Sequence, residues 1–202
     1  MQSELWLVSD TPDRADMVDM GDEALVAGLK RGDRQATQCA VHHYAPALYR
    51  FAYYQLQDPQ LAEDIVSEVM VRMIENIDRF VLCQAPFRAW LFRIARNLIS
   101  DQHRACKRRP QVSLERWLDA EPEKEPGECD LGFDTILDRE ELRSGLLTLT
   151  GEQREVILLH VIEDWELPEV ARLLDRSLAS VKGLYYRGIE SLRSALLSQQ
   201  HQ

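Results

Sequence analysis

The chain has 202 residues, of which 45% are hydrophobic and 29% charged, and its formal net charge is −10. This length allows one large or two small domains with a real hydrophobic core. No apolar run approaches the ~20 residues needed to span a bilayer, which excludes membrane insertion, so we expect a soluble cytoplasmic protein. A net negative charge argues against DNA binding, but the charge is unevenly distributed along the chain.

The N-terminal segment is strongly acidic. Its first 23 residues contain one cation, Arg14, against Glu4, Asp10, Asp13, Asp16, Asp19, Asp22 and Glu23. This composition lacks the basic start of a secretory signal peptide. We expect residues 1–22 to be a disordered extension; the alternative is a segment that masks basic surfaces elsewhere in the chain.

Apolar residues then recur at helical spacing, and no stretch alternates as a half-buried strand would. The pattern predicts four helices, over Glu23–Arg31, Gln35–Gln57, Pro59–Ile77 and Phe87–Lys107. Asp58-Pro59 is typical of a turn followed by a helix start, and Pro110 stops the fourth helix.

The segment that follows changes in character. Between Pro110 and Asp134 it contains three prolines, two glycines and a large excess of acidic over basic residues. Such a composition buries too little apolar surface to order itself. We therefore predict an acidic linker over residues 111–135, between helical domains at 23–110 and 136–197, with a tail at 198–202. The fold class is all-α.

The second domain contains a helix-turn-helix pattern. Thr150 with Gln153 is a capping box that starts one helix. The apolar face of a short first helix is formed by Val170, Ala171 and Leu174. The turn is Asp175-Arg176, because Asp tolerates the left-handed conformation. Ser177 is a good N-cap for a second helix, which is anchored by Val181, Leu184 and Tyr185. In a DNA-binding protein the second helix lies in the major groove. An ordinary helical hairpin is the alternative.

The Phe87–Lys107 helix and the residues after it are basic. Phe87, Trp90, Leu91, Ile94 and Leu98 form the predicted apolar stripe. On through Arg109, seven cations stand against Asp101 alone: Arg88, Arg93, Arg96, Arg104, Lys107, Arg108 and Arg109. Cations beside aromatic residues suit a nucleic-acid backbone with unstacked bases. A solvated basic helix and an arginine-rich protein interface are the alternatives.

Several phrases together resemble the extracytoplasmic-function (ECF) sigma factors of the sigma-70 family. Region 2 of that family resembles Asp58-Pro59, Glu63-Asp64, Glu68-Val69-Met70 and, almost unaltered, the phrase Phe87–Asn97. Region 4 resembles Glu152–Val156 and Val181-Lys182 with Arg187. The resemblance implies an alternative sigma factor, which gives core RNA polymerase its promoter specificity and is not itself an enzyme.

The resemblance also implies site residues in the first domain. Core polymerase, through the coiled coil of its largest subunit, would bind the face of Asp64, Glu68, Val69 and Arg72. The loop from Arg79 to Pro86 would capture a flipped base of the −10 element. Contacts with that element are expected from Arg79, Phe80, Arg93, Arg96, Asn97, Asp101, Arg104, Lys107 and Arg108.

In the second domain, the resemblance implies −35 duplex readout by Arg176, Ser177, Ser180, Lys182 and Arg187. The polymerase flap and an anti-sigma factor are further expected partners. The linker would follow the channel of nascent RNA, or serve only as a flexible spacer. Gly183 and Gly188 lower the helix propensity of the recognition helix, which leaves the −35 sequence open.

Other classes explain the pattern less completely. A dimeric helix-turn-helix regulator accounts for the C-terminal half but leaves the basic helix without a purpose. A regulator that only sequesters a partner also leaves the basic helix unexplained. A nucleic-acid hydrolase would need a metal, yet His42, His43 and His103 lack recognised ligand spacing. The four cysteines contain no C-x-x-C pair, and we expect reduced thiols, with a redox role as the alternative. No cofactor, metal or catalytic residue is expected.

Overall fold

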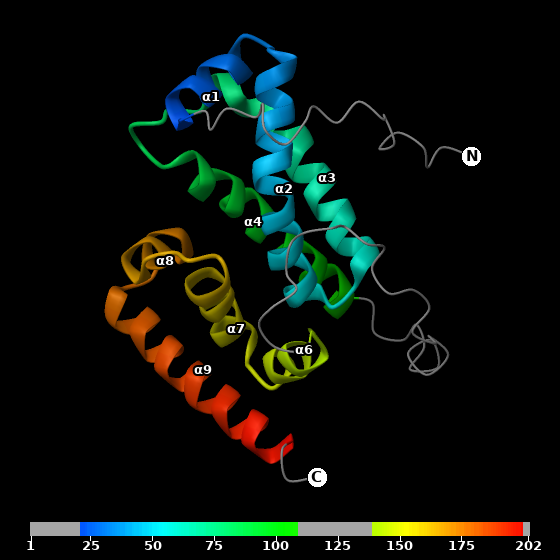
Figure 1. Ribbon diagram of the computed structural model, residues 1–202, viewed down its shortest axis with the longest axis vertical. Coiled ribbons are helices and arrows are strands. Elements are labelled where there is room, and N and C mark those ends of the chain that lie inside the picture. The colour runs from blue at the N-terminus through cyan, green and yellow to red at the C-terminus, as the bar shows by residue number, and fades with distance from the viewer. Residues whose placement is uncertain (1–20, 109–138, 200–202) are drawn as a thin grey trace, which may run out of the picture.

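The computed structural model describes residues 21–108 and 139–199. Within these ranges every regular element is a helix, so the all-α prediction is confirmed (Figure 1). The predicted extension at 1–22 lies almost entirely outside the described residues, and so do the acidic linker and all but Ser198 and Gln199 of the tail. No helix of the described part is long and apolar enough to cross a membrane.

The N-terminal module consists of four α-helices and a short 3₁₀ turn: α1 (Asp22–Lys30), α2 (Arg34–Leu56), α3 (Pro59–Asn76), η1 (Ile77–Arg79) and α4 (Phe87–Arg108). The predicted helices therefore begin and end within a residue or so of their observed bounds. Local chemistry sets those bounds. The Asp58 carboxylate accepts from the Leu61 backbone N–H at 3.0 Å, and Pro59 occupies the first turn, where its missing N–H costs nothing.

The core of this module lies where α2, α3 and α4 meet. Its largest fully buried side chains are Leu48, Phe51, Val69, Met73, Phe87, Leu91 and Phe92. Aromatic rings pack edge-on or tilted within it, with Phe51 and Phe92 centroids 5.3 Å apart. Burial of apolar surface contributes ~25 cal/mol per Å² to the free energy of folding. It is the main stabilising contribution here, because a single helix of this length is only marginally stable by itself in water.

Helix α1 approaches α2 very closely at one glycine. A Cβ placed on Gly28 would lie 2.6 Å from the Cβ of Ala36, which is itself fully buried. The α1–α2 crossing therefore requires glycine at this position, although glycine is a poor helix former.

We expect Gly28→Ala to destabilise the protein by about 1–2 kcal/mol. Overpacking a tight contact costs about 1–3 kcal/mol, which exceeds the ~1 kcal/mol that alanine gains in helix propensity. Denaturant unfolding followed by circular dichroism measures the change. Gly151→Ala is the matched control, because no atom lies within 4 Å of its added Cβ; equal stability of the two variants would refute the close contact.

The C-terminal module contains α6 (Arg139–Leu147), α7 (Gly151–Ile157), a π-helical segment η2 (Leu158–Ile162), α8 (Leu167–Leu174) and α9 (Leu178–Gln199). The predicted capping box is confirmed: the Thr150 hydroxyl accepts from the Gln153 N–H at 3.3 Å, and the Gln153 side chain accepts from the Thr150 N–H at 3.0 Å. Arg154 ties α6 to α7 by donating to the carbonyls of Leu146 and Leu149.

The helix-turn-helix is α8, the turn at Asp175-Arg176, and α9. Asp175 adopts the predicted left-handed conformation, with φ 54° and ψ 48°, and the Ser177 hydroxyl accepts from the Ser180 N–H at 3.2 Å as an N-cap. Gly188 has a packing role, since an added Cβ would lie 3.2 Å from Ile157. The glycine that weakens α9 as an isolated helix thus lets it cross α7 closely.

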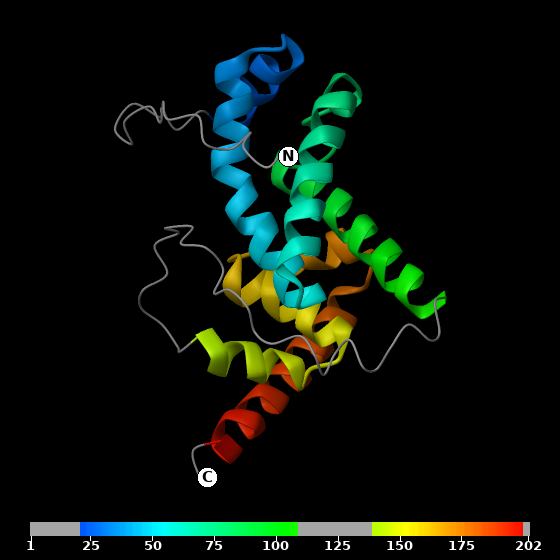
Figure 2. The ribbon, with the colours of Figure 1, turned by 90° about the vertical axis from the view of Figure 1, so that its right-hand side faces the viewer.

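The two modules pack against each other. Helix α2 contacts α7 and η2, and α4 contacts α8. Figure 2 shows the yellow and gold helices of the C-terminal module against the lower part of α2.

Candidate nucleic-acid and polymerase interfaces

The apolar stripe of α4 is broader than predicted. Phe87, Leu91 and Leu98 are buried as expected, but Trp90 and Ile94 are only partly buried. Phe92, Ala95 and Ile99, which the prediction omitted, are buried. The reason is that α4 has two neighbours: α2 and α3 cover one side, and Trp165 of the C-terminal module packs on Phe92, with centroids 5.2 Å apart.

Phe80 does not belong to an exposed DNA-contacting surface. Its side chain is 6% exposed, stacks on Trp90 with centroids 4.8 Å apart and meets Phe87 edge-on. Lys30 donates to the Phe80 carbonyl at 2.7 Å. The ring of Phe80, which was expected to contact the −10 element, is thus covered by other side chains in this arrangement and anchors the loop by packing on them.

The loop after Phe80 borders a hollow of about 600 Å³. Residues 82–86 form one wall, Gly21, Asp22 and Glu23 another, and Arg172 of α8 reaches it from the C-terminal module. Arg79, just before the loop, is exposed. The hollow is large enough for a base, but here it is bordered by two carboxylates as well as by one cation.

The remaining −10 candidates lie along α4. Arg93, Asn97, Asp101 and Arg104 are exposed, and Asp101 pairs with Arg104 at 3.4 Å. At 66% and 63% exposure this ion pair is solvent-screened and contributes little stability, so it does not prevent Arg104 from meeting a phosphate. Lys107 and Arg108 continue the same helix, but their side chains lie outside the described residues.

Arg96 is already paired. Its Nε lies 2.7 Å from a carboxylate oxygen of Glu155 on α7, and the two side chains are 32% and 15% exposed. A second pair joins the modules nearby: Arg50 of α2 donates twice to the Glu163 carboxylate, each bond 2.9 Å long. The Glu163 side chain is only 6% exposed, which makes this bidentate pair the more buried of the two.

Trp165 completes this inter-module contact, which comprises Arg50, Arg88, Phe92 and Arg96 on one side and Glu155, Glu163 and Trp165 on the other. Trp165 is 3% exposed, and the Arg88 guanidinium lies 4.3 Å from its ring centroid as a cation–π partner. Arg88 also donates to the Glu163 backbone carbonyl. The π-helical segment η2 and the left-handed Asp164 position Glu163 and Trp165 towards α2 and α4.

Burial changes the acid–base properties of the contact. Desolvation raises the pKa of the Glu155 carboxyl above its ordinary value of 4.5, opposed by Arg96 and Arg176. Desolvation likewise raises the pKa of Glu163, opposed by Arg50 and Arg88. For both groups the cost of burying the charge exceeds the attraction of the arginines, so the pKa stays above its ordinary value despite the ion pairs.

The −35 candidates lie at the start of α9. Ser177, Lys182 and Arg187 are exposed and Ser180 is half-buried, while Val181 and Leu184 face the core as predicted. Arg176 is paired with Glu152 rather than unoccupied. Tyr186, which the sequence prediction did not include, is 65% exposed beside Arg187. The only feature of the sequence that indicates its exposure is its position directly after Tyr185, on a helix whose other face is apolar.

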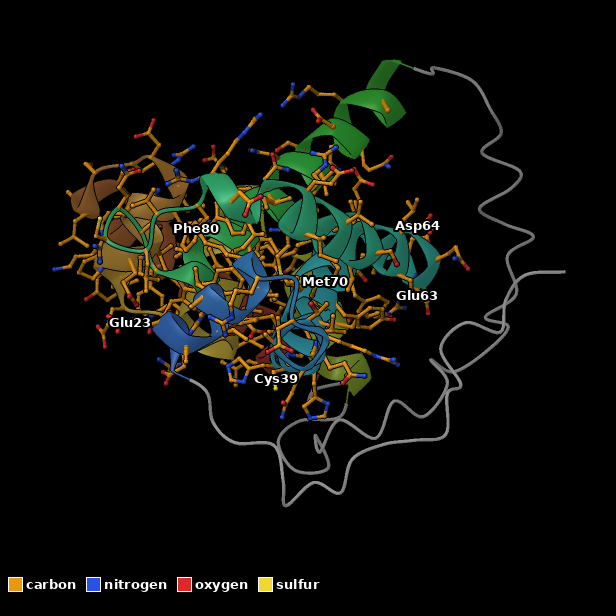
Figure 3. The ribbon with its side chains drawn as sticks, turned by 90° about the horizontal axis from the view of Figure 1, so that it is seen from above. Glu23, Cys39, Glu63, Asp64, Met70 and Phe80 are labelled. Carbon is orange, nitrogen blue, oxygen red and sulfur yellow. The ribbon has the colours of Figure 1, made fainter. Side chains whose placement is uncertain are left out.

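The predicted polymerase face of α3 requires one correction. Asp64 is exposed, and Glu68 and Arg72 form an i,i+4 pair at 2.7 Å, 46% and 42% exposed. Val69 is fully buried, so it cannot lie on this face. The apolar side chains beside the acids are instead Val71 and Ile74, 49% and 55% exposed. Figure 3 shows Glu63 and Asp64 at the end of the molecule remote from α8.

Comparison with known proteins identifies both modules. Residues 40–109 match the family model for sigma-70 region 2, and residues 139–192 match that for sigma-70 region 4. The chain is 32% identical to the ECF RNA polymerase sigma factor SigW of Bacillus subtilis, over 83% of this chain and 92% of SigW. It is 27% identical to SigL of Mycobacterium tuberculosis, over 86% and 96%.

It is also 30% identical to BldN of Streptomyces coelicolor, but spans only 64% of BldN. Among solved structures, CnrH in complex with the cytosolic domain of CnrY is 28% identical, with a TM-score of 0.64 over 88% of this chain and 97% of CnrH. The sigma factor RpoE of Bartonella quintana, in complex with the anti-sigma factor NepR, shares the fold, with a TM-score of 0.63, 22% identity and coverage of 79% and 95%.

The helix-turn-helix, the basic helix α4 and these matches agree on one class of protein, whose members are non-catalytic and direct RNA polymerase to specific promoters. The chain belongs to the ECF sigma factors of the sigma-70 family.

Proposed function

We propose that this sigma factor binds core polymerase through the exposed face of α3, meets the −10 element with α4 and the loop before it, and reads the −35 element with α9. The observation that carries this division is the charge of the three surfaces. The α3 face combines Asp64 and Glu68 with exposed Val71 and Ile74. Because its carboxylates are negatively charged, such a face is repelled by DNA phosphates. Exposed apolar side chains beside charges are instead typical of a surface that binds another protein.

The two other surfaces have the opposite character. The exposed side of α4 presents Arg93, Asn97 and Arg104, and the start of α9 presents Lys182 and Arg187. Cations position a nucleic-acid backbone, and amide or hydroxyl groups read base edges. We assign the −10 contacts to Arg79, Arg93, Arg96, Asn97, Asp101, Arg104, Lys107 and Arg108, and the −35 contacts to Arg176, Ser177, Ser180, Lys182, Tyr186 and Arg187.

The domain boundaries follow from the same division. We assign residues 23–110 to region 2 and 136–197 to region 4, with the acidic linker at 111–135, the extension at 1–22 and the tail at 198–202. Two modules on one chain can dock on separate polymerase surfaces, such as the largest-subunit coiled coil and the flap, and their affinities combine. We place the protein in the cytoplasm, where the polymerase is.

An anti-sigma factor is a further proposed partner. CnrH and the Bartonella RpoE were each solved in a complex, the former with the cytosolic domain of CnrY and the latter with the anti-sigma factor NepR. Coexpression with the protein encoded beside this sigma factor, followed by size-exclusion chromatography, tests for a stable complex.

Val69 and Val71 provide a sharp test of the α3 face. We expect Val71→Asp to weaken equilibrium binding to core polymerase by roughly tenfold, because it places a charge in a partly apolar interface at little cost to folding. Val69→Ala should leave core affinity nearly unchanged while lowering the free energy of unfolding by about 1–3 kcal/mol, because it opens a cavity in the core. The reverse pattern would contradict the assignment.

A further inference from the structure

We propose that Gly183 positions Arg187 for readout of the −35 element: because Gly183 has no side chain, the Arg187 guanidinium folds back along α9 and lies over the glycine, one turn nearer the base-reading end of the helix. This inference rests on the proposed −35 surface and deepens it. It makes Gly183 a determinant of promoter specificity that acts through another residue.

The Arg187 guanidinium borders the place where a side chain of residue 183 would stand. A Cβ placed on Gly183 would lie 3.2 Å from Nη1, 3.7 Å from Nη2 and 3.8 Å from Cζ of Arg187. These are its three nearest atoms beyond the neighbouring residues and the backbone of the helix itself. Residues four apart share one face of a helix, and a long side chain leans towards the N-terminus of its helix. The arginine therefore uses the space that the glycine leaves free.

Neither backbone conformation nor packing among the described residues requires a glycine at position 183. The backbone of Gly183 is helical, whereas the positive-φ glycine of the described residues is Gly32. Gly188 differs from Gly183, because its added Cβ would lie 3.2 Å from the buried Ile157. Glycine is the poorest helix former after proline, so Gly183 weakens α9 without improving its packing. A role in function accounts for its presence.

Gly183 and Arg187 lie on the side of α9 that faces away from the protein. Helix α9 packs on α6, α7 and α8, and in Figure 1 it follows the outer edge of the C-terminal module. Val181 is fully buried, and Gly183, two residues later, is turned by about 200° from it. In a helix-turn-helix this outward side of the second helix enters the major groove. The guanidinium is therefore presented to DNA.

The Arg187 guanidinium is also available for DNA. Glu152 holds Arg176, whereas Arg187 is exposed and pairs with no carboxylate in the described part of the chain. A guanidinium is a planar fork of N–H donors that matches O6 and N7 of guanine. Lying back over four residues brings this fork about 6 Å closer to the N-terminal end of α9, which is the end that contacts base edges. We therefore expect a guanine of the −35 element as its partner.

Holding the fork over Gly183 also lowers the cost of binding. An arginine loses rotamer freedom when its guanidinium is fixed on a base, and a fork that already has its orientation loses less. A methyl group at position 183 would stand 3.2 Å from Nη1, closer than an ordinary contact. Because the guanidinium is the end of a flexible side chain, it would move away and leave the reading position.

Gly183→Ala should make the protein more stable and yet weaken promoter binding. Replacing a helical glycine should raise Tm by about 1–4 °C, because only the end of the Arg187 side chain has to move. The holoenzyme formed with core polymerase should bind a promoter fragment recovered by run-off transcription at least about fivefold more weakly, as measured by fluorescence anisotropy.

Gly151→Ala is the matched control, because it adds the same methyl group where no atom lies within 4 Å. It should keep promoter affinity within about twofold of the wild type, as expected of a surface substitution outside the assigned contacts. An unchanged promoter affinity of Gly183→Ala, or a lower Tm, would overturn the proposal.

A double-mutant cycle separates the positioning of Arg187 from a direct clash between the new methyl group and DNA. Arg187→Ala should weaken promoter binding by roughly 5- to 150-fold. In that background Gly183→Ala should change the affinity by less than about twofold, because the glycine acts only through the arginine. Equal losses from Gly183→Ala with and without Arg187 would show that the methyl group itself meets DNA and would refute the inference.

Replacing single guanines of the −35 element by 7-deazaguanine, which lacks the N7 acceptor, identifies the base. At one guanine the replacement should weaken binding of the wild-type holoenzyme by at least about threefold. The same replacement should weaken binding of Gly183→Ala and Arg187→Ala by less than about twofold. Equal losses in all three proteins at every guanine would contradict guanine readout by Arg187.

Side-chain NMR of the free chain tests the position of Arg187 without a promoter. The heteronuclear NOE of the Arg187 Nε–H group should be high in the wild type and fall in Gly183→Ala towards that of a flexible side chain. If run-off transcription gave no specific transcripts, the proposed function would fail, while this measurement would still report on Arg187. A flexible Arg187 side chain in the wild type would overturn the inference even if specific transcripts were obtained.

Discussion

Charge reversal of Asp64 and Glu68 to lysine should weaken association with core polymerase by at least roughly 30-fold. Removing one partner of an interfacial charge pair costs about 2 kcal/mol or more, and reversal adds repulsion. Glu68→Lys also places a cation beside Arg72, which now lies 2.7 Å from the Glu68 carboxylate. Equilibrium binding of labelled sigma factor to core polymerase measures the loss.

The same variant should fold normally and keep its inter-module contact, because Asp64 is exposed and the Glu68–Arg72 pair is solvent-screened. Glu190→Lys is the control, an exposed charge reversal on α9 outside the proposed face. If both proteins bound core polymerase equally well, the α3 face would not be the polymerase interface.

Asn97→Ala should spare core binding and reduce run-off transcription by roughly 5- to 150-fold. Asn97 is exposed on α4 between Arg93 and Arg104, and an amide that reads a base edge contributes about 1–3 kcal/mol. The defect should lie in promoter opening, because the −10 element is captured as a separated strand. Permanganate footprinting of unpaired thymines reports this step.

Gln38→Ala is the matched control, since Gln38 is an exposed amide on α2 outside the assigned surfaces. A promoter opened artificially, by mismatches across the −10 region, should reduce the Asn97→Ala defect but not abolish it. Identical losses of core binding in Asn97→Ala and in the Asp64–Glu68 variant would contradict the division between α3 and α4.

The helices could be predicted because their start and stop signals are local. Asp58 before Pro59, Thr150 with Gln153, and Asp175 before Ser177 each use hydrogen bonds or dihedral preferences within a few residues. These signals do not depend on what packs against the helix. The order of the elements and the all-α class followed from them.

The site residues were less predictable because a motif fixes position along the chain, not orientation. Val69 lies one residue from Glu68, but a helix turns about 100° per residue, so one is buried and the other half-exposed. The resemblance implies that Phe80 contacts the −10 element, yet its ring packs on Trp90 and Phe87. In both cases packing decides which side chain is left for a partner.

The inter-module contact had no signal in the sequence. Arg50 and Glu163 are 113 residues apart, and nothing in the sequence around Arg50 distinguishes it from a solvated cation. Glu155 belongs to the phrase that resembles region 4, but that phrase does not indicate a partner on α4. Long-range ion pairs depend on how whole modules meet, which neither periodicity nor capping specifies.

The most direct test of the central claim is run-off transcription from genomic promoter fragments by bacterial core polymerase, with and without the full chain. A sigma factor should yield new, specific transcripts that require its addition and whose start sites share −10 and −35 elements. Specific binding of duplex DNA by the protein alone, at palindromic sites and without new transcripts, would contradict this account and favour a dimeric helix-turn-helix regulator.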